Sequence, residues 1–331
     1  MAAATTDIAR AQPQRMTQPD SHLYSRLRGW TPIAFHPENG TVEWADLRGH
    51  NFDQPFFSRT LERWRAQDPR PTVHTDLQAL AALDDEPSVE PDLIIAHPSR
   101  CGSTLLARLA AATVAPSILI SEPEIFAALL NHNLKGGLEA PIEPILRQVV
   151  RAHGRIHSGW EGRYIVKLPS NMSRYLPVFR RAFPDAPMVW LQRRPDEILE
   201  SNLNNPARPP TPLPPEAMVR WIVRRLTLAF MAAATFVDDK IAVLDYRDLA
   251  LDPLASLAGL MHFEPTPGDL TRMHAVTQLH GHNNRPYTPR EKQPLPKGLQ
   301  AIARETLDPM YRSLGARAQR RAFTGMGPPC R

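Results

Sequence analysis

The sequence predicts an α/β protein in which helices flank a parallel β-sheet, with a small N-terminal cap. Short apolar runs alternate with helix-forming segments through the centre of the chain, which is typical of this class. The first of these runs, at residues 93–97, leads into a polar turn and then into a helix-forming segment. The chain has 331 residues, 42% of them hydrophobic, so it can bury a large core.

The expected elements alternate regularly. Strands are expected at residues 93–97, 117–121, 164–168, 187–192 and 241–245. Helices are expected at residues 104–112, 124–130, 142–153, 171–182, 196–202, 216–238 and 253–261. Strands joined through helices favour a parallel sheet, and such sheets bind ligands beyond the carboxyl ends of their strands.

Four regions are predicted along the chain. Residues 1–20 contain scattered Arg, Gln and Pro without a continuous apolar stretch, so we expect a disordered leader. Residues 21–90 are expected to form a cap of short aromatic-bearing strands and one helix. Residues 91–320 are expected to form the main α/β domain, and residues 321–331 a tail.

The turn after the first strand has the layout of a phosphate-binding loop. In such a loop, the N–H groups of a tight turn and of the following helix converge on one point, where an anion binds. Compared with the pattern of ATP- and GTP-binding loops, His97 replaces the first Gly and Ser103 replaces the Lys. The cation is instead Arg100, inside the turn, and Ser103 and Thr104 offer hydroxyl groups at the helix start.

A second anion site is predicted where another strand ends. Arg193 follows the apolar run at residues 187–192, and Ser201 comes eight positions later. On a helix that begins near Arg193, both side chains can face one phosphate group. The sequence thus predicts two anion sites, each at the end of a strand.

This ordered set resembles the family of sulfotransferases that use 3′-phosphoadenosine-5′-phosphosulfate (PAPS). The turn with Arg100 and Gly102 resembles the family's 5′-phosphosulfate loop, and Arg193 with Ser201 resembles its 3′-phosphate site. The strand that ends in Lys167 before a Pro also resembles a family strand. The resemblance covers roughly residues 92–260, about half the chain.

The resemblance implies transfer of a sulfuryl group from PAPS, as co-substrate, to a hydroxyl or amine of a small-molecule or peptide-derived acceptor. Arg100 and the backbone around Cys101, Gly102, Ser103 and Thr104 would bind the 5′-phosphate and sulfate. Lys167 would stabilise the leaving oxygen, so that Arg100, Lys167 and a base form the catalytic set. No metal is required.

The catalytic base is expected to be Glu122. Many soluble family members have a His just after the Lys strand, but here Leu168 and Pro169 follow Lys167. Glu122 ends the strand beside the phosphate loop, where family branches with a glutamate base place it, and Glu124 is the second candidate. The alternative role of Glu122 is that of a helix N-cap or first-turn acid that satisfies local amides.

Other polar residues receive more general interpretations. The long irregular stretch at residues 278–297 is expected to fold over the donor, with Arg285 or Arg290 touching its phosphates. Cys101 is expected to be a small packing residue, with a reactive thiol as the alternative. His280 and His282 lack a third ligand at suitable spacing, so no metal site is predicted.

Composition limits the remaining function classes. A polyanionic donor accounts for the net charge of +5, and the chain has no zinc-finger spacing or long basic run, so nucleic-acid binding is not expected. No segment approaches the ~18 apolar residues of a membrane span, and the two cysteines form no disulfide pattern, so a cytoplasmic enzyme is expected. The alternatives are a phosphate-loop kinase or nucleotide hydrolase, and a catalytically degenerate member that only binds nucleotide.

Overall fold

The computed structural model describes residues 21–68, 70–114, 116–155, 162–205, 212–237, 241–261, 264–279 and 294–324. Within these ranges, a five-stranded parallel sheet has the order β5-β6-β4-β7-β8. Its strands are β4 (Leu93–Ala96), β5 (Ser117–Ser121), β6 (Arg163–Lys167), β7 (Met188–Gln192) and β8 (Ile241–Asp245). The predicted α/β class is therefore correct, and each expected strand lies within one residue of its observed bounds.

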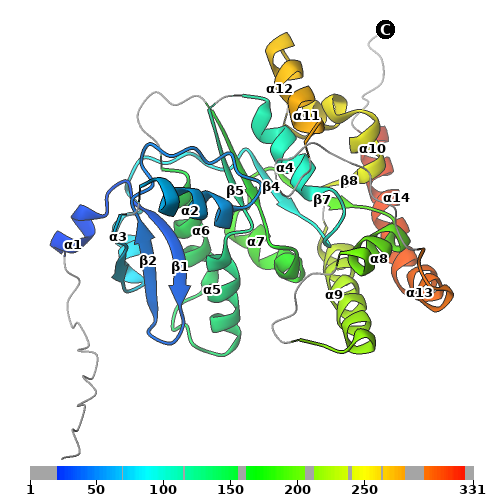
Figure 1. Cartoon of the computed structure of the whole chain (residues 1–331), viewed down its shortest axis with the longest axis horizontal. Helices are drawn as coiled ribbons and strands as arrows, with labels where there is room; N and C mark the ends of the chain where they lie inside the picture. Colours follow the sequence, from blue (N-terminus) through cyan, green and yellow to red (C-terminus); the bar gives the residue numbers. More distant parts are fainter. Residues whose placement is uncertain are drawn as a thin grey trace, which may run out of the picture.

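The sheet is buried on both faces, as its uninterrupted apolar runs predict. All four residues of β4 and all five of β7 are buried. On one face, α4 (Ser103–Ala112) packs against β5 and β6 and is covered by α11 (Pro253–Met261) and α12 (Pro267–Thr277). Because β4 lies centrally between β6 and β7, the turn that follows it is at the middle of the sheet's carboxyl edge (Figure 1).

The other connecting helices form a second layer. They are α5 (Glu124–Leu134), α6 (Ile142–His153), the 3₁₀ helix η1 (Ser170–Tyr175), α7 (Leu176–Ala182), α8 (Pro195–Asn204) and α9 (Pro215–Phe236). Helix α7 packs between α6 and α9, and α9 also packs against η1. The single helix expected at residues 171–182 is thus two elements, η1 and α7, with Pro177 near the start of α7.

The N-terminal cap is a small sheet with three helices. The antiparallel order β1-β2-β3 comprises β1 (Thr31–His36), β2 (Thr41–Ala45) and β3 (Val73–Thr75). Its helices are α1 (Ser21–Arg26), α2 (Phe57–Gln67) and α3 (Gln78–Ala82). Strand β1 packs on α5 and α6, and the buried side chains of the cap join those of the main sheet in one core.

The last helices cover the β8 side of the sheet (Figure 1). They are α10 (Tyr246–Leu251), α13 (Lys297–Ile302), the π-helical turn η2 (Ala303–Leu307) and α14 (Asp308–Thr324). Helix α14 packs on β8 and α9, and it extends into the tail predicted from residue 321. Among the described residues, none of the helices combines the length and apolar character needed to cross a bilayer.

Candidate functional site

The turn after β4 has a tightly curled backbone. Ser99, Arg100 and Gly102 have positive φ angles of 92°, 49° and 87°. A left-handed conformation costs a non-glycine residue about 1 kcal/mol or more, and such residues cluster at ligand sites. Gly102 is the N-cap of α4, so the free N–H groups of the first helical turn face the same hollow. A phosphate loop needs this geometry, and phosphate binding by these residues stays a prediction.

His97 holds the phosphate loop to the neighbouring elements. Its backbone N–H donates to Ser173 Oγ at 3.1 Å, and that hydroxyl donates to the His97 carbonyl at 2.6 Å. Ser99 N–H donates to His97 Nδ1, so Nε2 carries the proton and donates to the Leu168 carbonyl at 3.0 Å. Burial, assisted by the charge of Lys167, lowers the pKa of His97 to about 3. A neutral imidazole therefore braces the loop at the position where other phosphate loops have glycine.

Acid is expected to destabilise the protein through its buried histidines. Burial also lowers the pKa of His153 to about 4, below its ordinary value of 6.5. The unfolded chain therefore binds a proton that the folded protein excludes between these two pH values. The free energy of unfolding should fall as the pH drops from 6.5 to 4, by up to about 1.4 kcal/mol per pH unit for this histidine.

His153→Gln tests this pH dependence. The glutamine amide can replace the Nε2 donor that reaches the Pro32 carbonyl at 2.8 Å, but it does not titrate. Urea unfolding at pH 7, 6 and 5 should give a shallower decline of stability for the variant than for the wild type. Parallel declines would show that His153 does not contribute.

A cavity of about 460 Å³ opens at the phosphate loop. Its walls include five of the predicted site residues: Arg100, Gly102, Ser103, Thr104 and Glu122. Cys101 is fully buried and is absent from these walls, and burial raises the pKa of its thiol to about 12. The packing role predicted for the Cys101 side chain fits this position better than a reactive thiol does.

Glu122 and Lys167 form an ion pair beside this cavity. The ends of β5 and β6 are adjacent, with Ser121 opposite Lys167 in the parallel register. Lys167 Nζ bonds to Glu122 Oε1 and lies 5.2 Å from the centroid of the Phe56 ring. The Lys167 side chain is only 1% exposed whereas that of Glu122 is 28% exposed, so the carboxylate is the member of the pair that meets the cavity.

Glu122 is fixed by its backbone as well as by its side chain. Its φ is 53°, and its N–H donates to the Lys167 carbonyl at 2.8 Å. Its Oε1 also lies 3.7 Å from His97 Nε2. The N-cap of α5 is Pro123, and the Glu122 carboxylate turns toward Lys167. Glu124, the second candidate base, is exposed in the first turn of α5 and is not part of the cavity walls.

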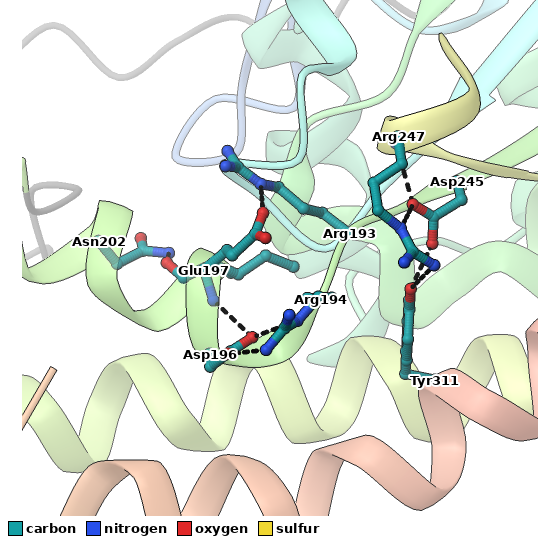
Figure 2. Close-up of polar contacts among 9 residues, drawn as sticks. Arg193, Arg194, Asp196, Glu197, Asn202, Asp245, Arg247 and Tyr311 are labelled. Carbon is teal, nitrogen blue, oxygen red and sulfur yellow. Dashed lines mark hydrogen bonds and ion pairs between the residues drawn. The ribbon is translucent and has the colours of Figure 1, made fainter. Parts of the chain in front are cut away.

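The predicted second anion site lies at the start of α8 (Figure 2). Arg193 Nε donates to Glu197 Oε2 at 2.5 Å, and its guanidinium lies 4.6 Å from the centroid of the Tyr246 ring. Ser201 lies on the same helix and is partly exposed. Arg193 is not part of the cavity wall, but Tyr246 is, so one ring touches both the cavity and Arg193.

A polar cluster holds the strand end from which Tyr246 projects. Tyr311 donates from its hydroxyl to Asp245 Oδ2 at 2.5 Å, and Arg247 contacts both residues, as Figure 2 shows. Burial, followed by the bond to Asp245, raises the pKa of Tyr311. Asp245 also accepts the N–H of Arg247 as the N-cap of α10. The residue between them, Tyr246, is thereby held at the end of β8.

The sequence reasoning missed several residues of the cavity wall. Phe56 comes from the cap, Arg108 from the second turn of α4, and Ser170 from η1. Arg108 lies four residues after Thr104 on the same helix, and this spacing was the one feature of the sequence that could have predicted its place in the cavity wall. Tyr246, at the end of β8, lines the cavity as well.

Two further predicted site residues, Arg285 and Arg290, lie outside the described residues. Thr277 and Leu279, at the end of α12, do line the cavity. The stretch expected to cover the donor therefore starts at the cavity wall, and the roles of Arg285 and Arg290 remain predictions.

One group of potential metal ligands is present in the part of the chain that the structure describes. Its members are His36, Glu43 and His74 on the cap sheet, with ligand atoms within 4.8 Å of one another. None of the three lines the phosphate-loop cavity. The expectation of a reaction that needs no metal stays a prediction.

A comparison with protein-family models shows the family to which the chain belongs. The family model described as "Sulfotransferase family" matches residues 91–264, more than half of the chain, and includes the phosphate loop, Glu122, Lys167 and Arg193. The chain belongs to the sulfotransferase family. No curated protein matches its sequence significantly.

Solved sulfotransferase structures are similar to this family member at low identity. A sulfotransferase from Mycobacterium tuberculosis is 13% identical, with 72% of this chain and 84% of that one covered and a TM-score of 0.43. One from Mycobacterium avium is 18% identical, with 75% and 81% covered and a TM-score of 0.40. One from Alicyclobacillus acidocaldarius is 13% identical, with 70% and 96% covered and a TM-score of 0.39. Sequence identities and TM-scores this low carry no information about individual site residues.

Substitution of Gly102 is expected to destabilise the phosphate loop of this sulfotransferase. An added Cβ would lie 2.4 Å from Tyr246 Cδ2, in addition to the strain of a φ of 87°. Gly49 is a matched control because its φ is 84° and nothing lies within 4 Å of an added Cβ. Urea unfolding should show Gly102→Ala losing about 2 kcal/mol more than Gly49→Ala. Equal losses would mean that Tyr246 can move away freely.

Proposed function

We propose that this sulfotransferase transfers a sulfuryl group from PAPS to a hydroxyl or amine of a small-molecule or peptide-derived acceptor. The observation that carries the proposal is the Glu122–Lys167 ion pair at the phosphate-loop cavity. The pair supports the proposal because a partly exposed carboxylate can act as a general base toward an acceptor hydroxyl. A buried ammonium beside it can stabilise negative charge that develops on the leaving oxygen.

Donor binding is assigned to the loop and to α8. Arg100, the hydroxyls of Ser103 and Thr104, and the N–H groups of the first turn of α4 offer donors to the 5′-phosphate and sulfate. Arg193 and Ser201 are proposed to hold the 3′-phosphate. The bond from Arg100 Nη2 to the Asn205 carbonyl supports this arrangement, because it ties the loop to the end of α8.

In the proposed reaction, Glu122 accepts the proton of the acceptor hydroxyl while the acceptor oxygen forms a bond to sulfur. The bond between sulfur and the bridging oxygen of the donor breaks, and adenosine 3′,5′-bisphosphate leaves with the electron pair. Lys167 stabilises the charge on that oxygen. By analogy with phosphoryl transfer, positioning and electrostatics supply most of the rate enhancement.

Binding of adenosine 3′,5′-bisphosphate tests the donor assignment. Calorimetry should show micromolar-range affinity for the wild type and a loss of at least about tenfold for Arg193→Ala. Arg194→Ala is the matched control, because Arg194 is exposed and pairs with Asp196 (Figure 2). No binding by the wild type would refute the PAPS assignment, and equal losses in both variants would refute the role of Arg193.

Transfer itself is tested with isotopically labelled PAPS and cell extract. Mass spectrometry should find a product that has gained one SO3 in the presence of the protein. Bisphosphate binding with no such product across a broad acceptor panel would support a member that only binds nucleotide. Magnesium-dependent ATP turnover would instead support a kinase or hydrolase.

A further inference from the structure

A second cavity, of about 550 Å³, meets the phosphate-loop cavity at Glu122 and Ser170, which line both. Its other walls come from α5, η1 and α9. A molecule in this second cavity can therefore reach Glu122, which also lines the phosphate-loop cavity. Its size is that of a small-molecule site. We place the acceptor here, a step that rests on the proposed function.

Two arginines give the second cavity a concentrated positive charge. Arg174 of η1 and Arg225 of α9 both line it. Within the described ranges, neither guanidinium lies within 4 Å of a carboxylate, and Arg225 Nη2 donates to the neutral hydroxyl of Ser170 at 3.3 Å. A half-buried arginine without a carboxylate partner is unusual, because burial of a charge is costly unless a counter-charge is close.

The arginines are also close enough to act on each other. Burial lowers the pKa of Arg225, Glu122 opposes this shift, and the positive charge of Arg174 adds to it. Both groups stay protonated at neutral pH because arginine does not lose its proton in proteins. The repulsion between them is relieved when a bound anion accepts hydrogen bonds from both.

Aromatic rings hold the two guanidinium groups in place. Arg225 lies 4.5 Å from the centroid of the Trp221 ring, and Arg174 lies 4.7 Å from that of Tyr175. Stacked arginines lose less conformational freedom when they bind a planar or tetrahedral anion. Met172 and Trp221 add apolar surface to the same cavity.

We propose that the acceptor is a small amphiphilic molecule with an anionic oxygen group, which Arg225 and Arg174 bind while the acceptor's hydroxyl or amine faces Glu122. The apolar body of the acceptor packs against Met172 and Trp221. Arg174 and Arg225 line only the second cavity, so the anionic group of the acceptor lies away from the donor phosphates in the phosphate-loop cavity. Two kinds of acceptor fit this description: an apolar body with a hydroxyl group that carries either a carboxylate or a phosphate.

Ligand-observed NMR on the protein saturated with adenosine 3′,5′-bisphosphate tests this inference. The probes are 3-(4-hydroxyphenyl)propanoate, its neutral amide, and (4-hydroxybenzyl)phosphonate. The wild type should bind at least one anionic probe about tenfold more tightly than the amide. The stronger of the two anionic probes identifies the carboxylate or phosphate class. Equal binding of all three, or no binding of either anion, would overturn the proposal.

Substitution of the two arginines tests whether they bind the anionic group of the acceptor. Arg225→Met keeps an apolar stem over Trp221 and should abolish the preference for anions, while Arg174→Met, at an exposed position, should reduce it by a smaller factor. Arg224→Met is the matched control, because it removes the same charge from an exposed position next along α9. Bisphosphate affinity should be unchanged in all three variants. Weakened bisphosphate binding in Arg225→Met would assign the arginine to the donor and overturn the proposal.

This design separates the inference from the proposed function. If the wild type does not bind the bisphosphate, the donor assignment fails regardless of what the probes do. If the bisphosphate binds and the anionic probes do not, the donor assignment stands and the acceptor class is wrong.

Discussion

Glu122→Gln is expected to lower kcat for sulfuryl transfer by about two to four orders of magnitude, the usual contribution of a positioned general base. Glutamine keeps the size of the side chain but cannot accept the acceptor's proton. The amide can also stay near Lys167, so the walls of both cavities keep their shape. Affinity for adenosine 3′,5′-bisphosphate should therefore change little.

Glu124→Gln is the matched control for this experiment. It makes the same chemical change two residues later, at an exposed position on α5 outside both cavities. Rates with labelled PAPS and bisphosphate affinities should be measured for both variants. A full rate in Glu122→Gln together with a large loss in Glu124→Gln would make Glu124 the catalytic base. Full rates in both variants would show that neither glutamate is the base.

Lys167→Met is expected to lower kcat by about two to three orders of magnitude, the loss seen when one preorganised electrostatic contact is removed from a developing charge. The Lys167 side chain is almost fully buried beneath Phe56, so methionine fills most of its volume. Glu122 is partly exposed and can be hydrated when its partner is removed. The variant should therefore remain folded, which its circular dichroism spectrum and thermal midpoint check.

The double variant Glu122→Gln/Lys167→Met separates two roles of the lysine. If Lys167 stabilises the leaving oxygen directly, its replacement should lower the rate further in the Glu122→Gln background. If Lys167 acts only by holding the Glu122 carboxylate, the double variant should be no slower than Glu122→Gln alone. The second result would make Lys167 a positioning residue.

The sequence was sufficient to predict the sheet because its central strands are buried on both faces. The runs at residues 93–96 and 188–192 contain apolar residues without alternation, and helix-forming segments separate them. The strand, the glycine turn and the helix at residues 93–112 were also predictable, because these three elements are contiguous in sequence.

One sequence could not predict which residues from distant segments come together at the two cavities. The ion pair of Glu122 with Lys167 depends on β5 and β6 being neighbours, which the strand order fixes and the local pattern does not. Phe56, Tyr246 and Arg225 reach the two cavities from segments far apart in the chain. Their local sequences indicate only aromatic or basic residues, so their positions required the folded structure.

The two bonds between Glu122 and Lys167, one from each part of the glutamate, have an evolutionary consequence. The backbone N–H and the carboxylate of Glu122 both bond to Lys167, the last residue of β6, at the carboxyl edge of the sheet. The position of this pair is thereby fixed by the sheet, and not by η1 or α9, whose residues share with Glu122 only the lining of the second cavity. On the proposed function, substitutions in η1 and α9 would change which compound is modified and leave Glu122 and Lys167 in place, so selection and protein engineering could diversify the enzyme through these two helices.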